Sequence, residues 1–379
     1  MIEVYIVEAR RTPFGSFGGV LSEIPASELA SQVVRDLLQR QPVPFEAIDE
    51  VIIGQVLQGG CAQAPARQAM RLAGLPDSVH AMTINKVCGS GLKSIMLAAD
   101  GIRLGDVDLV IAGGMENMSL APYFVPKARF GHRLGNGQMI DLMIHDGLQD
   151  PYSGRHMGEI TEAWIERHGL SREEQDEYSA RSYRLAQAAV AAGTFTDELT
   201  PVIKSSRKGE ITIDQDEEPA RGNIDKLSSL RPAFKQNGKI TAGNASTIND
   251  GAAFTLVCSK AAMDQHGLKP LARLVASASH SIAPDDFAEA PVGAIKKAVE
   301  RAGLTLDDID LFEINEAFAA VPLLAIRELN INPEKVNVNG GAVAIGHPIG
   351  ASGARLAVTL TRELRARQLR YGVASLCIG

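Results

Sequence analysis

The sequence predicts an α/β protein in which two related halves each form a mostly parallel sheet covered by helices. Three observations support this fold class. The 379 residues include 36 glycines, with 45% hydrophobic and only 5% aromatic residues, a composition typical of an α/β protein with many tight turns. Short apolar runs alternate with amphipathic helical patterns along the chain. An internal duplication repeats the same order of elements in both halves.

The first half reads strand, helix, strand, helix, strand. Residues 4–7 are a short apolar run, and the leucines and valines of 29–38 recur at the spacing of one helix face. A second apolar run at 48–53, a helical pattern over 90–102 and a buried run at 109–112 complete the half. Catalytic groups are expected where such strands end and helices begin.

The second half repeats these elements at a nearly constant distance along the chain. The Ile-Asp pair at 48 recurs at 309, an offset of 261, and the Ser-Gly pair that opens a helix at 90 recurs at 352, an offset of 262. We therefore divide the chain into an N-terminal core half (1–118), an inserted loop domain (119–249) and a C-terminal core half (250–379). The insert, with a charged helical tract near 172–192, is expected to make the substrate-specific contacts.

Composition excludes several classes of function. The 38 Lys and Arg against 45 Asp and Glu give a net charge of −7 without basic blocks, so no nucleic-acid partner is predicted. No segment approaches the roughly 18 apolar residues of a membrane helix. The four cysteines show no CxxC or other metal-ligand spacing, and Met1 is not followed by a leader pattern, so a cytoplasmic chain with reduced thiols and no metal site is predicted.

Cys88 lies in the turn between a strand-like stretch and a helix, within the run Val87-Cys88-Gly89-Ser90-Gly91, with Ser90 as the expected N-cap. A thiol at this place meets the positive end of the helix dipole, which favours the thiolate. A buried structural cysteine is the plainer alternative, but the flanking glycines let a substrate approach the backbone, so we interpret Cys88 as a nucleophile.

His347 lies in the glycine-rich loop 339–353, which occupies the equivalent place in the second half. If the halves pack about a pseudo-twofold axis, the two loops face each other and His347 reaches Cys88, where it raises the thiolate fraction. The alternative is a solvent-facing loop histidine. Spacing alone leaves the roles of two further residues open. Cys377 is a core cysteine in its simplest interpretation, and Asn315 is either a helix cap or a polar group of the central site.

Taken together, these segments resemble the thiolase family over essentially the whole chain. The matching stretches are Val87–Gly91, Gly113–Ser119, Ala242–Ser246 with Asn249–Gly251, Asn315–Ala319, Gly346–Gly350 and Cys377–Gly379. The resemblance implies a five-layered α/β/α/β/α sandwich of two duplicated core domains, with the loop domain covering the substrate. The family also continues past its Cys-Ile-Gly with a final strand, so the resemblance implies that the printed sequence is shortened.

The resemblance assigns roles residue by residue. Cys88 would take the acyl group of an acyl-CoA, His347 with a water held by Asn315 would stabilise the enolate of the second substrate, and Cys377 would be the acid/base. Backbone N–H groups of Cys88 and Gly379 would form an oxyanion hole. No cofactor is implied beyond coenzyme A thioesters, which are substrates. The residues implied to contact coenzyme A are Ser246, Leu148, His156, Met157, Ala317, Phe318 and Arg221.

The function implied is an acetyl-CoA acetyltransferase that condenses two acetyl-CoA to acetoacetyl-CoA, or cleaves 3-ketoacyl-CoA. A thiolase of broader chain length in fatty-acid β-oxidation is the alternative, followed by a ketosynthase or hydroxymethylglutaryl-CoA synthase, and then a non-catalytic CoA or lipid binder. Segment 123–137 resembles the loop through which dimers pair into tetramers, so a homodimer or dimer of dimers is expected. A hydratase/dehydrogenase subunit, as in degradative relatives, is a further possible partner.

Overall fold

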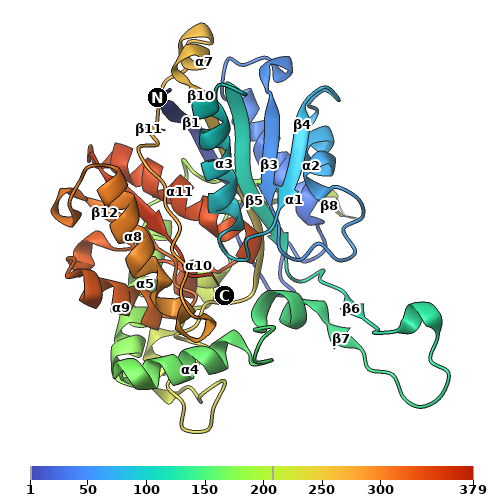
Figure 1. The fold of residues 1–379 in the computed structure, drawn as a ribbon, viewed down its shortest axis with the longest axis vertical. Helices are drawn as coiled ribbons and strands as arrows, with labels where there is room; N and C mark the ends of the chain where they lie inside the picture. The colour runs from blue at the N-terminus through green and yellow to red at the C-terminus, as the bar shows by residue number, and fades with distance from the viewer. Residues whose placement is uncertain (1, 207–208, 379) are drawn as a thin grey trace.

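The computed structural model describes residues 2–206 and 209–378, and they form five stacked layers (Figure 1). Helices α1 (Ala26–Gln39) and α2 (Pro65–Ala73) cover one face of a large sheet. Helices α3 (Ser90–Leu104) and α11 (Ile349–Ala366) lie between this sheet and a second, smaller one. The far face of the smaller sheet packs against α8 (Ala290–Arg301) and α9 (Ala320–Leu329). The predicted five-layered sandwich is confirmed.

The large sheet has seven strands in the order β11-β1-β10-β5-β3-β4, with β2 paired to β10. Its strands are β1 (Val4–Arg11), β2 (Gly15–Ser16), β3 (Glu50–Gly54), β4 (His80–Ile84), β5 (Leu109–Asn117), β10 (Asn249–Ser259) and β11 (Ala272–Arg273). The pairs of β3 with β4 and with β5 are parallel, whereas β10 runs antiparallel to β1 and β5. Both faces are covered, so β5 and β10 are buried throughout.

The smaller sheet pairs β12 (Leu311–Ile314) with β13 (Gly372–Ser375) in parallel. It belongs to the predicted repeat, because β12 follows α8 as β3 follows α1, and β13 follows α11 as β5 follows α3. The strands and helices predicted at 48–53, 90–102 and 109–112, and the helical tract near 172–192, are all present, the last as α5 (Arg172–Ala191).

The observed place of strand β10 differs from the predicted division of the chain into halves. We placed residues 250–379 in the C-terminal half, but β10 pairs with β1 and β5 of the large sheet. By strand pairing, the N-terminal unit therefore includes β10 up to Ser259 and, after α7 (Lys260–Gln265), also β11. Periodicity along the chain could not show this, because an apolar strand carries no mark of the sheet that it joins.

The inserted segment contributes short elements around the sandwich, with β8 (Val202–Ser206) beside α1, and a long hairpin (Figure 1). The hairpin is formed by β6 (Tyr123–Phe124) and β7 (Ile140–Asp141). The other elements are α4 (Met157–His168), α5, β8, β9 (Gly209–Ile213) and α6 (Glu218–Arg221), with α10 (Ala342–Ile345) from the second half packed against α5 and α6. Across the ranges that the structure describes, no helix has the combined length and hydrophobicity needed to cross a membrane.

Candidate active site

Cys88 lies in a tight turn between β4 and α3. The residue before it, Val87, has a positive φ of 45°, an uncommon backbone angle for a β-branched side chain. The hydroxyl of Ser90 fixes the turn, because it accepts a hydrogen bond from the Lys86 N–H at 2.7 Å and donates to the Val87 carbonyl at 2.7 Å. Gly89, rather than the expected Ser90, is the N-cap residue of α3. The prediction of Ser90 as N-cap was wrong by one residue, since its side chain turns back to the loop.

His347 lies in the corresponding turn before α11. Gly346 takes a φ of 108°, and a Cβ there would meet the amide of Asn249 at 2.5 Å, so glycine is required. The freed space lets the Asn249 Oδ1 accept a hydrogen bond from the His347 backbone N–H at 2.8 Å. The histidine side chain is 5% exposed, which excludes the solvent-facing alternative.

Glycines let the Cys88 turn and the His347 turn meet. A Cβ on Gly91 would lie 2.9 Å from the Gly350 carbonyl oxygen, and a Cβ on Gly353 would lie 2.5 Å from the Leu92 nitrogen. The first turns of α3 and α11 are therefore in backbone contact, as the pseudo-twofold arrangement predicts. Ile349 and Cys88 belong to the same apolar cluster, which joins the two turns through their side chains as well.

The imidazole of His347 is held at both nitrogens. Nδ1 lies 2.5 Å from the Ser352 Oγ, and Nε2 lies 3.4 Å from the Asn315 Nδ2. Burial lowers the pKa of His347 to about 3, and the positive charge of Arg355 adds to this shift. The ring is therefore neutral near pH 7, the state in which it can accept a proton.

Asn315 and Cys377 follow the two strands of the smaller sheet. The Asn315 N–H donates to the Ser375 carbonyl at 2.9 Å, so the ends of β12 and β13 lie together. Asn315 is fully buried before α9 begins at Ala320, so its predicted alternative role as a helix cap was wrong. Its Oδ1 accepts no hydrogen bond from the described part of the chain.

Cys377 is 1% exposed, and two causes raise the pKa of its thiol. Burial is the larger cause, and a negative charge on Cys88 is the second. The second cause shows that the two sulfurs are within electrostatic reach of each other. Cys88, His347, Asn315 and Cys377 thus meet at one site, with Gly379 outside the described residues.

Most of the residues implied to contact coenzyme A lie in one group beside this site. The Ser246 N–H donates to the Ala317 carbonyl at 3.0 Å, and Ala245 forms a bridge with Phe318. His156 stacks on Phe234 with ring centroids 4.8 Å apart, and Phe234 meets Phe318 edge to face at 6.3 Å. Met157 packs against the same cluster. Burial lowers the pKa of His156, so this wall is uncharged near neutral pH.

The structure places Leu148 and Arg221, the two other residues implied to contact coenzyme A, in two different surroundings. Leu148 packs in the apolar cluster that contains Cys88 and Ile349, so the structure places it beside Cys88. Arg221 is exposed at the end of α6, and among the described residues it shares no hydrogen bond or ion pair with the Ser246 group. The structure does not bring Arg221 into the group.

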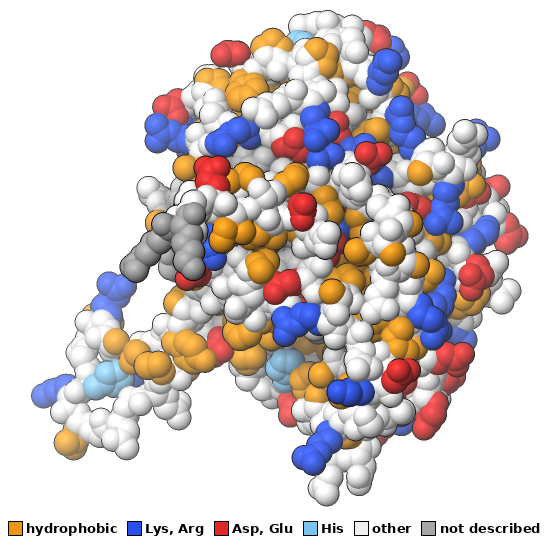
Figure 2. All heavy atoms as spheres, turned by 180° about the vertical axis from the view of Figure 1, so that it is seen from behind, with side chains coloured by type: hydrophobic (Ala, Val, Ile, Leu, Met, Phe, Trp, Pro, Cys, Tyr) orange, Lys and Arg blue, Asp and Glu red, His pale blue; other side chains and the backbone are white. Residues whose placement is uncertain are grey.

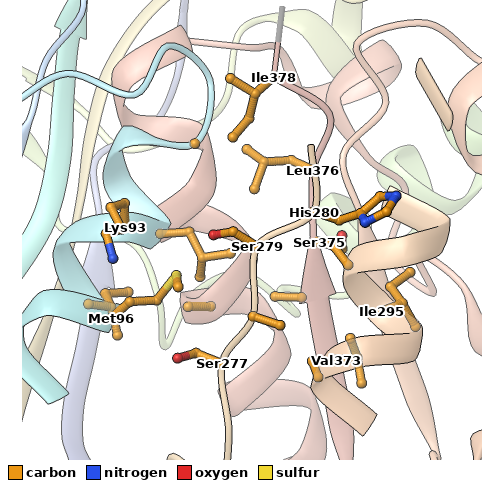
Figure 3. A pocket seen from close by; sticks show the side chains of 18 of the residues that line it. Lys93, Met96, Ser277, Ser279, His280, Ile295, Val373, Ser375, Leu376 and Ile378 are labelled. Atoms are coloured by element: carbon orange, nitrogen blue, oxygen red, sulfur yellow. The ribbon is translucent and has the colours of Figure 1, made fainter. Parts of the chain in front are cut away.

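A groove of about 1260 Å³ opens beside the site (Figure 3). It separates the extended segment 274–283 from β13, and in Figure 3 Ser277, Ser279 and His280 lie on that segment. By the duplication the segment corresponds to β1 and β13 to β5, so the groove has the place that β10 fills in the first half. One end reaches the sequence neighbours of both cysteines, namely Val87, Gly89 and Ile378. Because its lining includes none of the four meeting residues, we assign the chemistry to them and not to the groove.

Sequence reasoning missed four residues that hold the site together: Asn249, Ser352, Phe234 and Glu116. Asn249 and Glu116 lie inside motifs that we singled out, but a buried side chain that bonds backbone amides leaves no spacing signal. Ser352 was used only to align the repeats. In the described ranges no group of three or more His, Cys, Asp or Glu is placed to hold a metal ion.

Comparison with known proteins agrees with this geometry. Residues 4–261 match the family described as "Thiolase, N-terminal domain" and residues 268–379 match "Thiolase, C-terminal domain". The chain is 50% identical to the acetyl-CoA acetyltransferases of Pseudomonas aeruginosa and Chromobacterium violaceum, over 100% of this chain and 97% of each relative. The crystal structure of the Bacillus anthracis acetyl-CoA acetyltransferase superposes with a TM-score of 0.97 at 42% identity, covering 100% of this chain and 96% of that one. The chain belongs to the thiolase family.

Proposed function

We propose that the chain is an acetyl-CoA acetyltransferase, which condenses two acetyl-CoA to acetoacetyl-CoA and CoA through an acetyl-Cys88 intermediate and also catalyses the reverse thiolysis. The observation that carries the proposal is the meeting of two thiols with a neutral, buried histidine at the adjoining ends of α3, α11, β12 and β13. A single nucleophilic cysteine would serve a simple acyl transfer, whereas condensation also needs a base for a carbon acid.

In the first half-reaction the Cys88 thiol passes its proton to His347 Nε2 and its sulfur attacks the thioester carbonyl. The S–C bond to Cys88 forms, the bond to the CoA sulfur breaks, and the departing CoA thiolate takes a proton from Cys377. The backbone N–H of Cys88 is the described member of the predicted oxyanion hole, and Gly379 is its second predicted donor. Acetyl-Cys88, imidazolium and the Cys377 thiolate remain.

In the second half-reaction the Cys377 thiolate removes a proton from the methyl group of a second acetyl-CoA. The resulting enolate is stabilised by the imidazolium of His347 and by Asn315, whose Oδ1 is available for a bridging water. The carbanion attacks acetyl-Cys88, the new C–C bond forms, and Cys88 leaves as a thiolate that regains its proton from His347. Cys88, His347 and Cys377 then have the protonation states with which the cycle began, and the released CoA carries the proton that balances the one lost from the methyl group.

Acylation itself prepares the second thiol. A negative charge on Cys88 raises the pKa of Cys377, and an acetylated Cys88 carries no charge. The intermediate therefore lacks the Cys88 thiolate that would oppose a negative charge on Cys377 during the second half-reaction. This use of a second thiol fits a condensing thiolase better than a ketosynthase or hydroxymethylglutaryl-CoA synthase, the related enzymes whose active sites do not need the second thiol.

The substrate class follows from the group around Ser246. Ser246, Ala317, Phe318, His156 and Met157 form an uncharged, partly apolar wall that suits the pantetheine arm of coenzyme A. No separate cofactor is part of the proposal. The two catalytic cysteines must remain thiols, and all four cysteines of the chain are unbridged, which supports the predicted location in the reducing cytoplasm.

Assembly into a dimer of dimers is also proposed, and the hairpin between β6 and β7 supports it. Figure 2 shows this hairpin standing clear of the body with apolar side chains along it. Phe130 is 90% exposed and Leu134 is 99% exposed, so almost nothing in the described part of the chain covers them. A second copy of the chain is the natural cover. A hydratase/dehydrogenase subunit stays a prediction.

The decisive experiment is to incubate the protein with acetyl-CoA, digest it and locate the acetyl adduct by mass spectrometry. We expect the adduct on Cys88 in the wild type and in Cys61→Ser, a half-buried cysteine outside the site, and none in Cys88→Ala. An unmodified Cys88 in the wild type would refute the proposal. Comparing the thiolysis rates of acetoacetyl-CoA and a long 3-ketoacyl-CoA then separates the acetyltransferase from the β-oxidation alternative, because the latter predicts the faster rate with the long chain.

A further inference from the structure

We propose that Glu116 is a positioning residue that fixes the Cys88 loop and the His347 turn relative to each other; its kinetic consequence rests on the proposed function. Glu116 is the second-last residue of β5 and is fully buried between the two halves. The ion pairs of the described residues include none with Glu116, so charge pairing does not explain why a carboxylate lies there. A buried carboxylate without a cation is costly, and it needs another reason to be present.

The carboxylate instead accepts hydrogen bonds from three backbone N–H groups of two separate segments. Oε2 accepts from Val56 at 3.0 Å and Oε1 from Leu57 at 3.1 Å, both in the loop after β3. Oε2 also accepts from Gly350 at 3.0 Å, in the first turn of α11. One side chain therefore joins the first half of the molecule to the second.

The first two bonds lead to Cys88. The Val56 carbonyl accepts a hydrogen bond from the Asn85 side chain at 3.4 Å, and the Asn85 Oδ1 accepts one from the Val87 N–H at 2.9 Å. Val87 is the residue with the positive φ directly before Cys88. The side chains of Val56 and Leu57 also pack in the apolar cluster that includes Cys88. Moving the 56–57 loop would therefore shift the nucleophile.

The third bond leads to His347. Gly350 is three residues after His347, and Ser352, two residues further on, holds the imidazole Nδ1. The fit around Gly350 is close: a Cβ there would lie 2.7 Å from the Glu116 Oε2, and a Cβ on Gly114 would lie 2.0 Å from the Gly350 carbonyl oxygen. The His347 turn is thus clamped against β5, and Glu116 supplies the polar part of the clamp.

The geometry requires a side chain with two acceptor oxygens. Two acceptor oxygens serve three N–H donors, whereas an amide offers one acceptor and would turn its NH₂ group toward at least one of those donors. Shortening the side chain by one methylene, as in aspartate, would withdraw both oxygens from the loop or from the turn. Glu116→Gln and Glu116→Asp therefore test the same contact in two different ways.

The test measures the pH profile of Cys88 alkylation by iodoacetamide together with kcat and KM for acetoacetyl-CoA thiolysis. For Glu116→Gln we expect alkylation at pH 7 to slow about tenfold while the plateau rate at high pH stays within twofold of wild type, because His347 no longer lies in place to favour the thiolate. We also expect kcat to fall about 10²-fold with KM within threefold, since misplacement by about 1 Å has that effect.

The matched control is Glu162→Gln. Glu162 is a buried carboxylate that likewise accepts backbone N–H bonds, from Lys239 and Ile240, but it lies in α4. The Glu162→Gln variant should have a lower midpoint of thermal unfolding and an unchanged pH profile of Cys88 alkylation. The proposal would be overturned if wild type and Glu116→Gln had equal pH profiles of Cys88 alkylation. It would also be overturned if both glutamine variants shifted this profile by the same amount. If Glu116→Gln does not fold, Glu116→Asp carries the same expectations. The alkylation arm needs no acyl transfer, so it stands even where the proposed function fails.

Discussion

The Nδ1 of His347 and the Oγ of Ser352 lie 2.5 Å apart, and the same Oγ lies 2.9 Å from the Pro348 carbonyl oxygen. A carbonyl only accepts, so the serine hydroxyl donates to Pro348 and accepts from the imidazole Nδ1–H. This arrangement leaves the lone pair on Nε2, the nitrogen that faces Asn315. Ser352 therefore selects the tautomer in which Nε2 can take a proton.

Removing the Ser352 hydroxyl should slow catalysis without weakening substrate binding. For Ser352→Ala we expect kcat to fall about 10²-fold with little change in KM, because the general base loses its preferred tautomer and orientation while the walls that bind coenzyme A are untouched. Steady-state thiolysis of acetoacetyl-CoA measures both constants. A variant with wild-type kcat would show that the tautomer is fixed by other contacts.

Replacing the second thiol should separate the two half-reactions. In Cys377→Ser the hydroxyl is a far weaker acid than a thiol, so proton removal from the methyl group should slow by about 10²–10⁴-fold. Exchange of acetyl groups between acetyl-CoA and labelled CoA should be affected far less, since there the group at position 377 only protonates the departing CoA thiolate and removes no proton from carbon. Measuring exchange and condensation on one preparation gives the comparison, and condensation at the wild-type rate would remove Cys377 from the role of base.

The depressed pKa of His347 predicts a pH-dependent stability. The folded state, with a pKa of about 3, binds fewer protons than the unfolded state between pH 3 and the ordinary value of 6.5. Stability from this group is therefore present above pH 6.5 and is lost as the pH falls. Relative to His347→Asn, the wild type should lose about 2 kcal/mol of unfolding free energy between pH 8 and pH 5. Urea unfolding of both proteins across this range checks the slope, and parallel curves would contradict it.

The hairpin between β6 and β7 should control assembly and not folding. Phe130 and Leu134 are almost completely exposed, so Phe130→Ser with Leu134→Ser removes no core contact within the chain. We expect the double variant to shift from tetramer to dimer in light scattering after gel filtration, with its thermal midpoint lowered only by the lost assembly. The same replacement at Leu104, exposed at the end of α3, is the control and should leave the tetramer intact. A tetramer in both variants would exclude the hairpin as the interface.

Sequence reasoning predicted the fold because the repeat and the helical periodicities can be recognised directly along the chain. It also predicted that the Cys88 turn and the His347 turn lie against each other, since two equivalent loops of a duplicated fold face each other near the axis that relates them. The prediction that residue 250 begins the C-terminal half was wrong, because the sheet that a strand joins is not a local signal. Asn249–Ser259 follows the insert in the chain, and only its antiparallel pairing with β1 and β5 shows where it belongs.

The supporting residues of the site could not be predicted in the same way. Glu116 acts on Val56, Leu57 and Gly350, which are 59 to 234 positions away in the chain, and it binds their backbone, which has no residue-specific pattern. Ser352 resembled an ordinary residue of a helix start. Arg221 shows the converse case, because the resemblance implies a contact with coenzyme A, whereas the fold leaves Arg221 exposed on α6 and outside the Ser246 group.

The central layer of the sandwich has a consequence for folding. Helices α3 and α11 come from different halves, yet they pack on each other through Gly91 and Gly353, and α11 also touches both sheets. The first half cannot complete its hydrophobic core without α11, because Ala354, Ala357 and Val358 belong to the same cluster as residues of β1, β5 and α3. The two duplicated units should therefore unfold in a single cooperative transition, and the catalytic turns at the start of both helices form only when that transition is complete.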